Sequence, residues 1–180
     1  MPELRIAAVL ALAIILQLSL RAVWPPLVYI DFPLVVVVYV ALQRDAWQAL
    51  IAGTIAGLVV DAASGGLIGA GGFSKTLVAF IVYFAATRIN LENPLVRIPV
   101  LAAATVLDAT VYVALHRMLG QSLLVPFVQT LSYKLIGTTV IGTLAILMLN
   151  NLLSDKGRQR RQFADRRRVA RRSTGMLKRR

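Results

Sequence analysis

The chain contains no cysteine and a single histidine among its 180 residues. Without cysteine there is no disulfide, thiolate metal site or cysteine nucleophile, and one histidine excludes a metal site built from several histidines. Charged residues are scarce, at 16%, whereas hydrophobic residues make up 58%. Soluble domains average about 25% charged residues. With a mean hydropathy of +0.72, the composition excludes a soluble enzyme, a secreted soluble protein and a disordered protein, and predicts an integral membrane protein.

The positive charge lies mostly at the C-terminal end of the chain. Residues 150–180 hold 12 of the 20 basic residues but only two of the eight acids, so the rest of the chain is nearly neutral. We therefore expect a transmembrane domain over residues 1–150 and a basic cytoplasmic tail over residues 151–180. The tail has too few large apolar residues to form a core and is expected to be disordered.

Six apolar segments predict an all-α polytopic membrane protein with about six transmembrane helices. They cover residues 4–20, 27–42, 46–60, 73–87, 98–115 and 123–149. The second to fourth segments are shorter than the roughly 20 residues that a spanning helix needs, so five spans with one re-entrant segment is the alternative topology. With six spans, 16 basic residues lie on the side of both termini and three, Arg21, Lys75 and Arg117, on the other. This distribution predicts cytoplasmic termini.

A stripe of small residues runs along one face of the third predicted span. Gly53 and Gly57 form a GxxxG pattern that continues to Asp61. Small residues let two helix backbones approach closely, so we expect packing against another span of the same chain, with contact to a partner protein as the alternative. The loop after Asp61 has five glycines between residues 65 and 72. We expect Asp61 to cap this turn by accepting backbone N–H groups, where Gly65, Gly66 and Gly69 permit positive φ.

Two opposite charges lie deep within the last two predicted spans. Counted at about 1.5 Å per residue, Asp108 and Lys134 lie at similar depth on consecutive antiparallel helices. Charges in the hydrocarbon region usually pair or line a cavity. We therefore predict an intramembrane ion pair between Asp108 and Lys134, in preference to a transport or proton-relay role.

The remaining candidate chemical sites are weaker. Residues 69–76 resemble a Walker A loop, but Ser74 stands where that pattern requires glycine before Lys75. Ser74 and His116 are the best pair for intramembrane proteolysis, yet nothing completes a set of nucleophile, base and oxyanion donors. We therefore expect no enzymatic activity, no cofactor and no metal.

The arginine-rich tail has its own expected partner. Basic residues beside a cytoplasmic membrane face attract anionic lipid, whereas binding of nucleic acid is not expected because interleaved aromatic residues are missing. The expected lipid contacts are Arg158, Arg160, Arg161, Arg166, Arg167 and Arg168.

Several of these features together resemble a known family. They are residues 31–36, the turn 43–45, the glycine helix that ends in Asp61 and its Ser-Gly-Gly continuation, and the following helix over 73–78 that returns to Arg88. This pattern, over about residues 30–90, resembles the MreD family of rod shape-determining proteins. The long basic tail departs from the family, so no role is carried over to it.

The resemblance implies a non-enzymatic scaffold subunit of the bacterial inner membrane, in the complex that builds peptidoglycan during cell elongation. Its implied partners are an MreC-type periplasmic scaffold, an MreB-type filament, a RodA-type glycosyltransferase and a penicillin-binding transpeptidase. The implied fold is similar to the substrate-binding subunit of energy-coupling-factor transporters. A vitamin-transporter subunit is therefore the alternative function, in which Ala7 and Ala11 would contact the coupling partner. The glycine–Asp–glycine pattern favours MreD.

Overall fold

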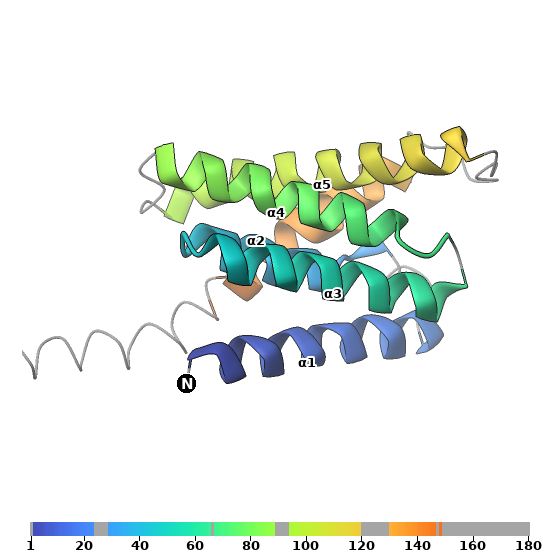
Figure 1. Cartoon of the computed structure of the whole chain (residues 1–180), viewed down its shortest axis with the longest axis horizontal. Coiled ribbons are helices and arrows are strands. Elements are labelled where there is room, and N and C mark those ends of the chain that lie inside the picture. Colours follow the sequence, from blue (N-terminus) through green and yellow to red (C-terminus); the bar gives the residue numbers. More distant parts are fainter. Residues whose placement is uncertain are drawn as a thin grey trace, which may run out of the picture. The chain divides into compact units, whose positions relative to one another are not determined.

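The computed structural model describes residues 2–23, 29–65, 67–88, 94–119, 130–146 and 148, and the described residues form six helices without a strand. The predicted all-α class is thus confirmed. The chain divides into two units after Ile146, and the six helices lie in the first, Met1–Ile146. The helices (Figure 1) are α1 (Pro2–Val23), α2 (Phe32–Leu42), α3 (Ala46–Ser64), α4 (Ala70–Arg88), α5 (Pro94–Met118) and a further helix, Thr130–Ile146, here called the C-terminal helix.

The distribution of side chains is that of a membrane protein. Three helices are long and apolar enough to cross a bilayer, namely Ala46–Ser64, Ala70–Arg88 and Val96–Met118. Large apolar side chains such as Ile55, Phe80 and Phe84 are about half exposed. Polar and charged side chains are instead buried among the helices: Gln17, Asp31, Asp61, Ser74, Lys75, Thr105, Asp108, His116 and Thr138. An apolar exterior around a polar interior suits lipid as the surrounding solvent.

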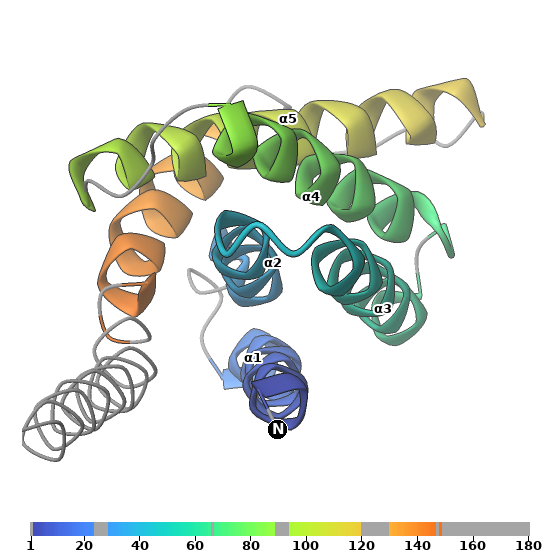
Figure 2. The same ribbon diagram turned by 60° about the vertical axis from the view of Figure 1, so that its left-hand side comes forward.

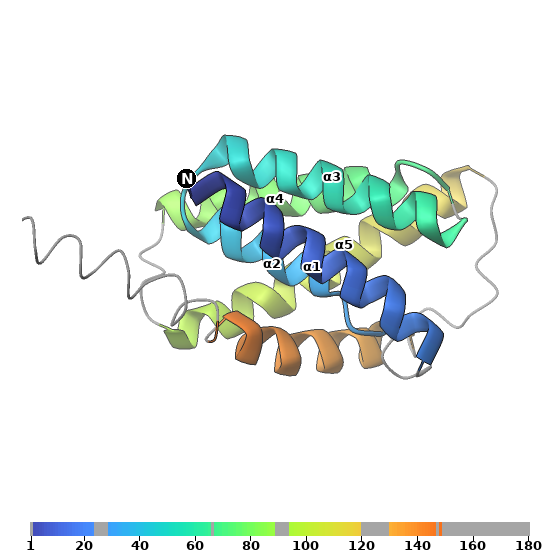
Figure 3. The same cartoon turned by 90° about the horizontal axis from the view of Figure 1, so that it is seen from below.

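Helix α2 lies in the middle of the bundle. Figures 1 and 3 show α3, α4 and α5 running in alternating directions, and Figure 2 shows α2 surrounded by the other helices. Every residue from Pro33 to Ala41 is buried. A helix that is buried on all sides must be apolar on all sides, and the run of valines from Val35 to Val38 meets this need.

The start of α2 lies inside the bundle, where its free N–H groups need partners. Eleven residues make a helix of about 16 Å, half the roughly 30 Å of a bilayer's hydrocarbon core. The Leu34 N–H donates to Asp31 Oδ1 at 3.0 Å, and the Phe32 N–H donates to Gln17 Oε1 of α1 at 3.0 Å. The Asp31 N–H donates to Thr138 Oγ1 of the C-terminal helix at 3.2 Å. Side chains from two other helices thus complete this half-length helix.

The predicted helices are present with shifted ends. Helix α3 runs to Ser64 rather than residue 60, and α4 begins at Ala70 rather than 73, so part of the predicted glycine loop is helical. The start of the sixth predicted span (123–129), Gly66 and the tail lie outside the described residues. So do the predicted lipid contacts Arg158, Arg160, Arg161, Arg166, Arg167 and Arg168.

Candidate functional site

Helices α3 and α4 meet backbone to backbone along a line of glycines. A Cβ atom placed on Gly53 would lie 2.9 Å from the carbonyl oxygen of Lys75, and one placed on Gly57 would overlap the backbone of Gly71 and Gly72. We call the contact made by Gly53, Gly57, Gly71 and Gly72 the glycine seam. The structure therefore places the GxxxG face inside the chain, against α4, where it is covered.

Asp61 holds the turn that joins α3 to α4. Its Oδ2 accepts the N–H groups of Gly69 at 3.0 Å, Gly71 at 2.8 Å and Gly72 at 3.2 Å. These amides lie at the start of α4, where N–H groups lack helical partners and a carboxylate is favourable. Gly65 ends α3 at φ +65°, and Gly69 has φ +102°, conformations that favour glycine. Asp61 thus caps the glycine turn through backbone N–H groups.

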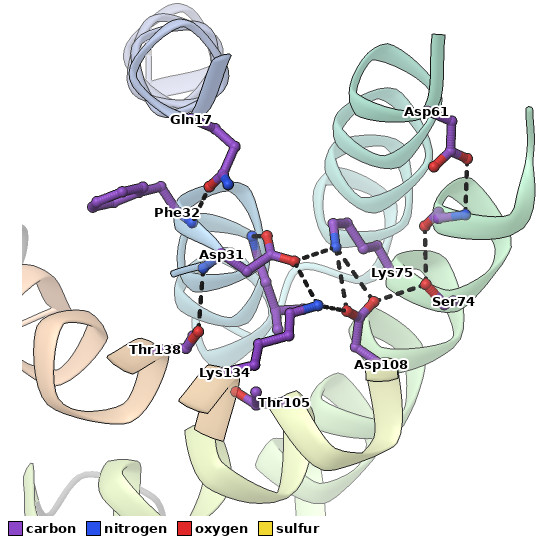
Figure 4. A network of polar contacts seen from close by, with 12 residues as sticks. Gln17, Asp31, Phe32, Asp61, Ser74, Lys75, Thr105, Asp108, Lys134 and Thr138 are labelled. Atoms are coloured by element: carbon purple, nitrogen blue, oxygen red, sulfur yellow. Dashed lines mark hydrogen bonds and ion pairs between the residues drawn. The ribbon is translucent and has the colours of Figure 1, made fainter. Parts of the chain in front are cut away.

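Four charged side chains form a cluster in the interior, the ion quartet of Asp31, Lys75, Asp108 and Lys134 (Figure 4). Lys75 Nζ lies 2.7 Å from Asp31 Oδ2 and 3.3 Å from Asp108 Oδ1. Lys134 Nζ lies 3.2 Å from Asp31 Oδ2 and 2.9 Å from Asp108 Oδ2. Each lysine therefore bridges both carboxylates, and the quartet is neutral when all four groups are ionised.

The ion quartet meets the conditions that buried charges require. The side chains of Lys75 and Asp108 are 5% and 2% exposed, and those of Asp31 and Lys134 are 12% and 22% exposed. Buried ions are tolerated when they are paired and their remaining positions are hydrogen-bonded. Ser74 supplies such a bond, because its Oγ donates to Asp108 Oδ1 at 2.7 Å. The quartet joins the start of α2 to α4, α5 and the C-terminal helix.

Ser74 also connects the ion quartet to the glycine seam. Its Oγ lies 3.2 Å from the carbonyl oxygen of Gly71, in addition to its contact with Asp108. A hydroxyl has one proton and an ionised carboxylate can only accept, so the shorter contact to Asp108 takes that proton. The two clusters thus meet within the first turns of α4.

Two of the four residues of the ion quartet were predicted from the sequence to form an ion pair. The structure brings Asp108 and Lys134 together, as their depth in the predicted spans suggested, but Asp31 and Lys75 were missed. The assignment of Lys75 to a membrane surface is wrong, because the residue lies within α4 and is 4% exposed. Its ammonium group is instead neutralised by Asp31 and Asp108. The available signal was that the predicted spans after the first contain two acids, Asp31 and Asp108, and two bases, Lys75 and Lys134.

The other candidate residues from the sequence lie in a helix or are buried. Residues 70–76 are helical, so the stretch that resembles a Walker A sequence lacks the open loop that cradles phosphate. Ser74 is fully buried, and His116 Nδ1 lies 2.9 Å from the Tyr112 carbonyl oxygen, with its ring 4.2 Å from the Tyr112 ring. Among the described residues, no group of three or more His, Cys, Asp or Glu side chains is placed to hold a metal ion.

The family of the chain follows from a comparison of its whole sequence. The family model described as rod shape-determining protein MreD matches residues 4–154, from α1 through the C-terminal helix. Among curated proteins and among solved structures, no match to the chain is found. The family match covers most of the 180 residues. The chain therefore belongs to the MreD family, the cell-shape-determining membrane proteins that give rod-shaped bacteria their form.

Proposed function

We propose that the protein acts as a non-enzymatic scaffold subunit of the bacterial cell-elongation complex, which builds peptidoglycan. The observation that carries this proposal is where its reactive groups lie. Ser74, Lys75 and Asp108 are buried and bonded to one another, whereas the exposed helix faces are apolar. Such a surface suits contact with lipid and with other membrane helices. Membership of a cell-shape family supports the choice of complex.

We infer from the family that the partners are an MreC-type scaffold, an MreB-type filament, a RodA-type glycosyltransferase and a penicillin-binding transpeptidase. Since the glycine seam is covered by α4, partner helices would use the exposed apolar faces instead. On α3 and α4 these faces carry Ile51, Ile55, Phe80, Ile81 and Phe84. No observation favours a vitamin-transporter subunit.

A tagged copy that supports rod growth provides the test. After extraction in a mild detergent, mass spectrometry of the co-purified proteins should find the MreC-type scaffold, and cells that lack the protein should become round. Rod shape maintained by the tagged copy with no elongation protein co-purified would overturn the scaffold role. A small molecule bound with nanomolar affinity would instead favour transport.

We further propose six spans in the inner membrane with both termini cytoplasmic. Once Lys75 is assigned to the interior, 16 basic residues remain on the terminal side against Arg21 and Arg117 on the other. The positive-inside rule then gives the orientation. Reporter fusions after Gly120 and at the C-terminus should lie on opposite sides of the membrane. The same side for both would favour five spans with a re-entrant segment.

The basic tail over residues 151–180 is proposed to contact anionic lipid rather than nucleic acid. Each basic residue near an anionic surface contributes about 1 kcal/mol. A peptide of residues 151–180 should float with vesicles that contain phosphatidylglycerol, and high salt should release it. Equal flotation with neutral vesicles would contradict the proposal. The arginines proposed to contact the lipid are Arg158, Arg160, Arg161, Arg166, Arg167 and Arg168.

A further inference from the structure

Two threonine hydroxyls from different helices meet on the exposed side of the glycine seam. Thr54 Oγ1 of α3 lies 2.8 Å from Thr76 Oγ1 of α4, and we call these two residues the threonine pair. The seam sets this distance, because a Cβ atom placed on Gly53 would lie 3.0 Å from Thr76 Cα. Among the described residues, the exposed hydroxyls of Thr87 and Thr110 contact only a carbonyl oxygen of their own helix. The threonine pair is therefore a distinct polar feature of the α3–α4 surface.

The threonine pair has fewer protons than oxygen contacts. Thr54 Oγ1 also lies 2.9 Å from the Leu50 carbonyl oxygen, and Thr76 Oγ1 lies 2.7 Å from the Gly72 carbonyl oxygen. Three contacts thus share two protons, since each hydroxyl carries one proton and can accept two hydrogen bonds. Whichever way the protons point, at least one of the two hydroxyl oxygens accepts no hydrogen bond from any described residue. The pair is therefore an acceptor that lacks a donor.

The position of the threonine pair along the helix restricts what can supply that donor. At 1.5 Å per residue, Thr54 is about 12 Å from the start of α3 at Ala46 and about 15 Å from its end at Ser64. At this depth in a bilayer water is scarce, and lipid acyl chains have no hydrogen-bond donor. Side chains of Ser, Thr, Asn and Gln on another membrane helix have donors, and such bonds join helices in bilayers. The missing donor therefore fits a protein helix and does not fit lipid.

Large apolar side chains surround the threonine pair. They stand three residues before and four residues after each threonine, and therefore on the same helix face as that threonine. Figures 2 and 3 show α3 and α4 side by side, on the side of the bundle away from the C-terminal helix. A helix laid on this face would meet apolar side chains around a polar centre. The four residues are between 40% and 58% exposed: Ile51, Leu58, Phe73 and Phe80.

We propose that the α3–α4 face centred on the threonine pair binds a membrane-spanning helix of a partner protein, which donates a hydrogen bond to the pair from a Ser, Thr, Asn or Gln side chain. The surrounding apolar side chains pack against the same helix. The glycine seam contributes indirectly, by holding the two hydroxyls together. This inference rests on the proposed scaffold role and names the surface that the role uses.

Removing both hydroxyls while keeping the side-chain shape tests the donor contact. Thr54→Val and Thr76→Val are combined in the tagged full-length protein, and mass spectrometry measures the elongation proteins that co-purify in mild detergent. The variant should melt close to the natural chain but recover several-fold less of the partner. Thr110→Val removes an exposed hydroxyl that bonds only within α5 and should recover the natural amount. Thr54→Ser combined with Thr76→Ser keeps both hydroxyls and should also recover it.

The outcomes of this experiment separate the inference from the scaffold role. If the natural chain recovers elongation proteins and the valine variant recovers them equally, the scaffold role stands and the threonine pair is not its contact. A serine variant that loses the partner as the valine variant does would also overturn the inference, because its hydroxyls are intact. If the natural chain recovers no elongation protein, the scaffold role fails and this inference fails with it.

A photo-cross-link tests the same face without depending on the folding of the valine variant. The amino acid p-benzoylphenylalanine is placed at Phe80, which is 51% exposed on α4, or at Val106, which is 38% exposed on α5. After irradiation of cells, position 80 should be joined to a membrane-spanning peptide of an elongation protein that contains Ser, Thr, Asn or Gln. Position 106 should not be joined to that peptide. At position 80, a product of two copies of this chain, or no protein product, would overturn the proposal.

Discussion

The glycine seam and the ion quartet hold helices together in opposite ways. Along the seam, Gly53 and Gly57 let the backbones of α3 and α4 touch, and stabilisation comes from close packing without any charge. In the quartet, four ionised side chains join the start of α2, α4, α5 and the C-terminal helix. A seam of this kind fails when an atom is added, whereas a charge cluster fails when a charge is removed.

This difference shows which substitutions each contact resists. Where the backbones touch, neither helix has room for added side-chain atoms. An ion cluster depends on charge balance, which a single substitution alters. Single substitutions can separate these two behaviours, and the largest effect is expected where an atom is added.

Adding a side chain to the glycine seam should have the largest effect. Gly57→Leu places atoms on the backbone of Gly71 and Gly72 and should destabilise the fold by more than about 3 kcal/mol, the upper end for overpacking. The measurement is the yield of monodisperse protein in detergent and its melting temperature. Val59→Leu, at a position 40% exposed on the same helix, should behave as the natural chain. A Gly57→Leu protein that melts at the same temperature as the Val59→Leu control would contradict this expectation.

Removing one carboxylate from the ion quartet should have an effect of similar size. Asp108→Asn leaves two buried ammonium groups against Asp31 alone, and breaking a buried ion pair in this way costs about 3–5 kcal/mol. Melting of the purified protein measures the loss. The matched control is Asp45→Asn at the N-cap of α3, where Asp45 accepts the Gln48 N–H at 3.1 Å. Asparagine caps as well as aspartate, so Asp45→Asn should melt at the temperature of the natural chain. A comparable drop for Asp45→Asn would show that the melting temperature does not report the loss of a buried ion pair.

Replacing Asp61 should lower the stability of the fold by an intermediate amount, which depends on the substituting residue. Asp61→Ala leaves the N–H groups of Gly69, Gly71 and Gly72 without their acceptor, at a cost of about 2 kcal/mol. Asp61→Asn keeps one oxygen that can accept these N–H groups but removes the negative charge beside the start of α4, and should lose about half as much. Thermal melting of both variants provides the comparison. An asparagine variant as unstable as the alanine variant would show that charge rather than hydrogen bonding matters.

The hydroxyl contact across the seam should matter least. Thr54 Oγ1 lies 2.8 Å from Thr76 Oγ1 on the exposed side, and hydrogen bonds between membrane helices contribute about 0.6 kcal/mol on average. Thr54→Val keeps the shape and should lower the melting temperature only slightly. A loss as large as that of Asp108→Asn would place the strength of the seam in its hydroxyl groups rather than in its glycines.

Much of this arrangement could be predicted where the residues lie close together in the sequence. Asp61 and Gly69 share one short turn, and the helical spacing of Gly53 and Gly57 is visible in the sequence itself. Asp108 and Lys134 could be paired because they lie on consecutive segments at matching depth. In each case the chain between the residues limits where they can be.

The remaining features could not be predicted from the sequence, because they depend on how the helices pack. Lys75 was assigned to a surface because it lies near the start of its apolar segment, and no spacing indicates that α4 begins three residues earlier, at Ala70. The central place of α2 and the bonds from Gln17 and Thr138 to its first residues link positions 15 and 107 residues apart. Such contacts follow from how the helices pack, which periodicity does not show.

The central claim is that the four charges act as one neutral unit, and a double-mutant cycle tests it most directly. Asp108→Asn and Lys134→Met each leave one unpaired charge, whereas the double variant keeps Asp31 paired with Lys75 at 2.7 Å. The account predicts that the purified double variant melts at a higher temperature than either single variant. A double variant that melts at or below the worse single variant would contradict it.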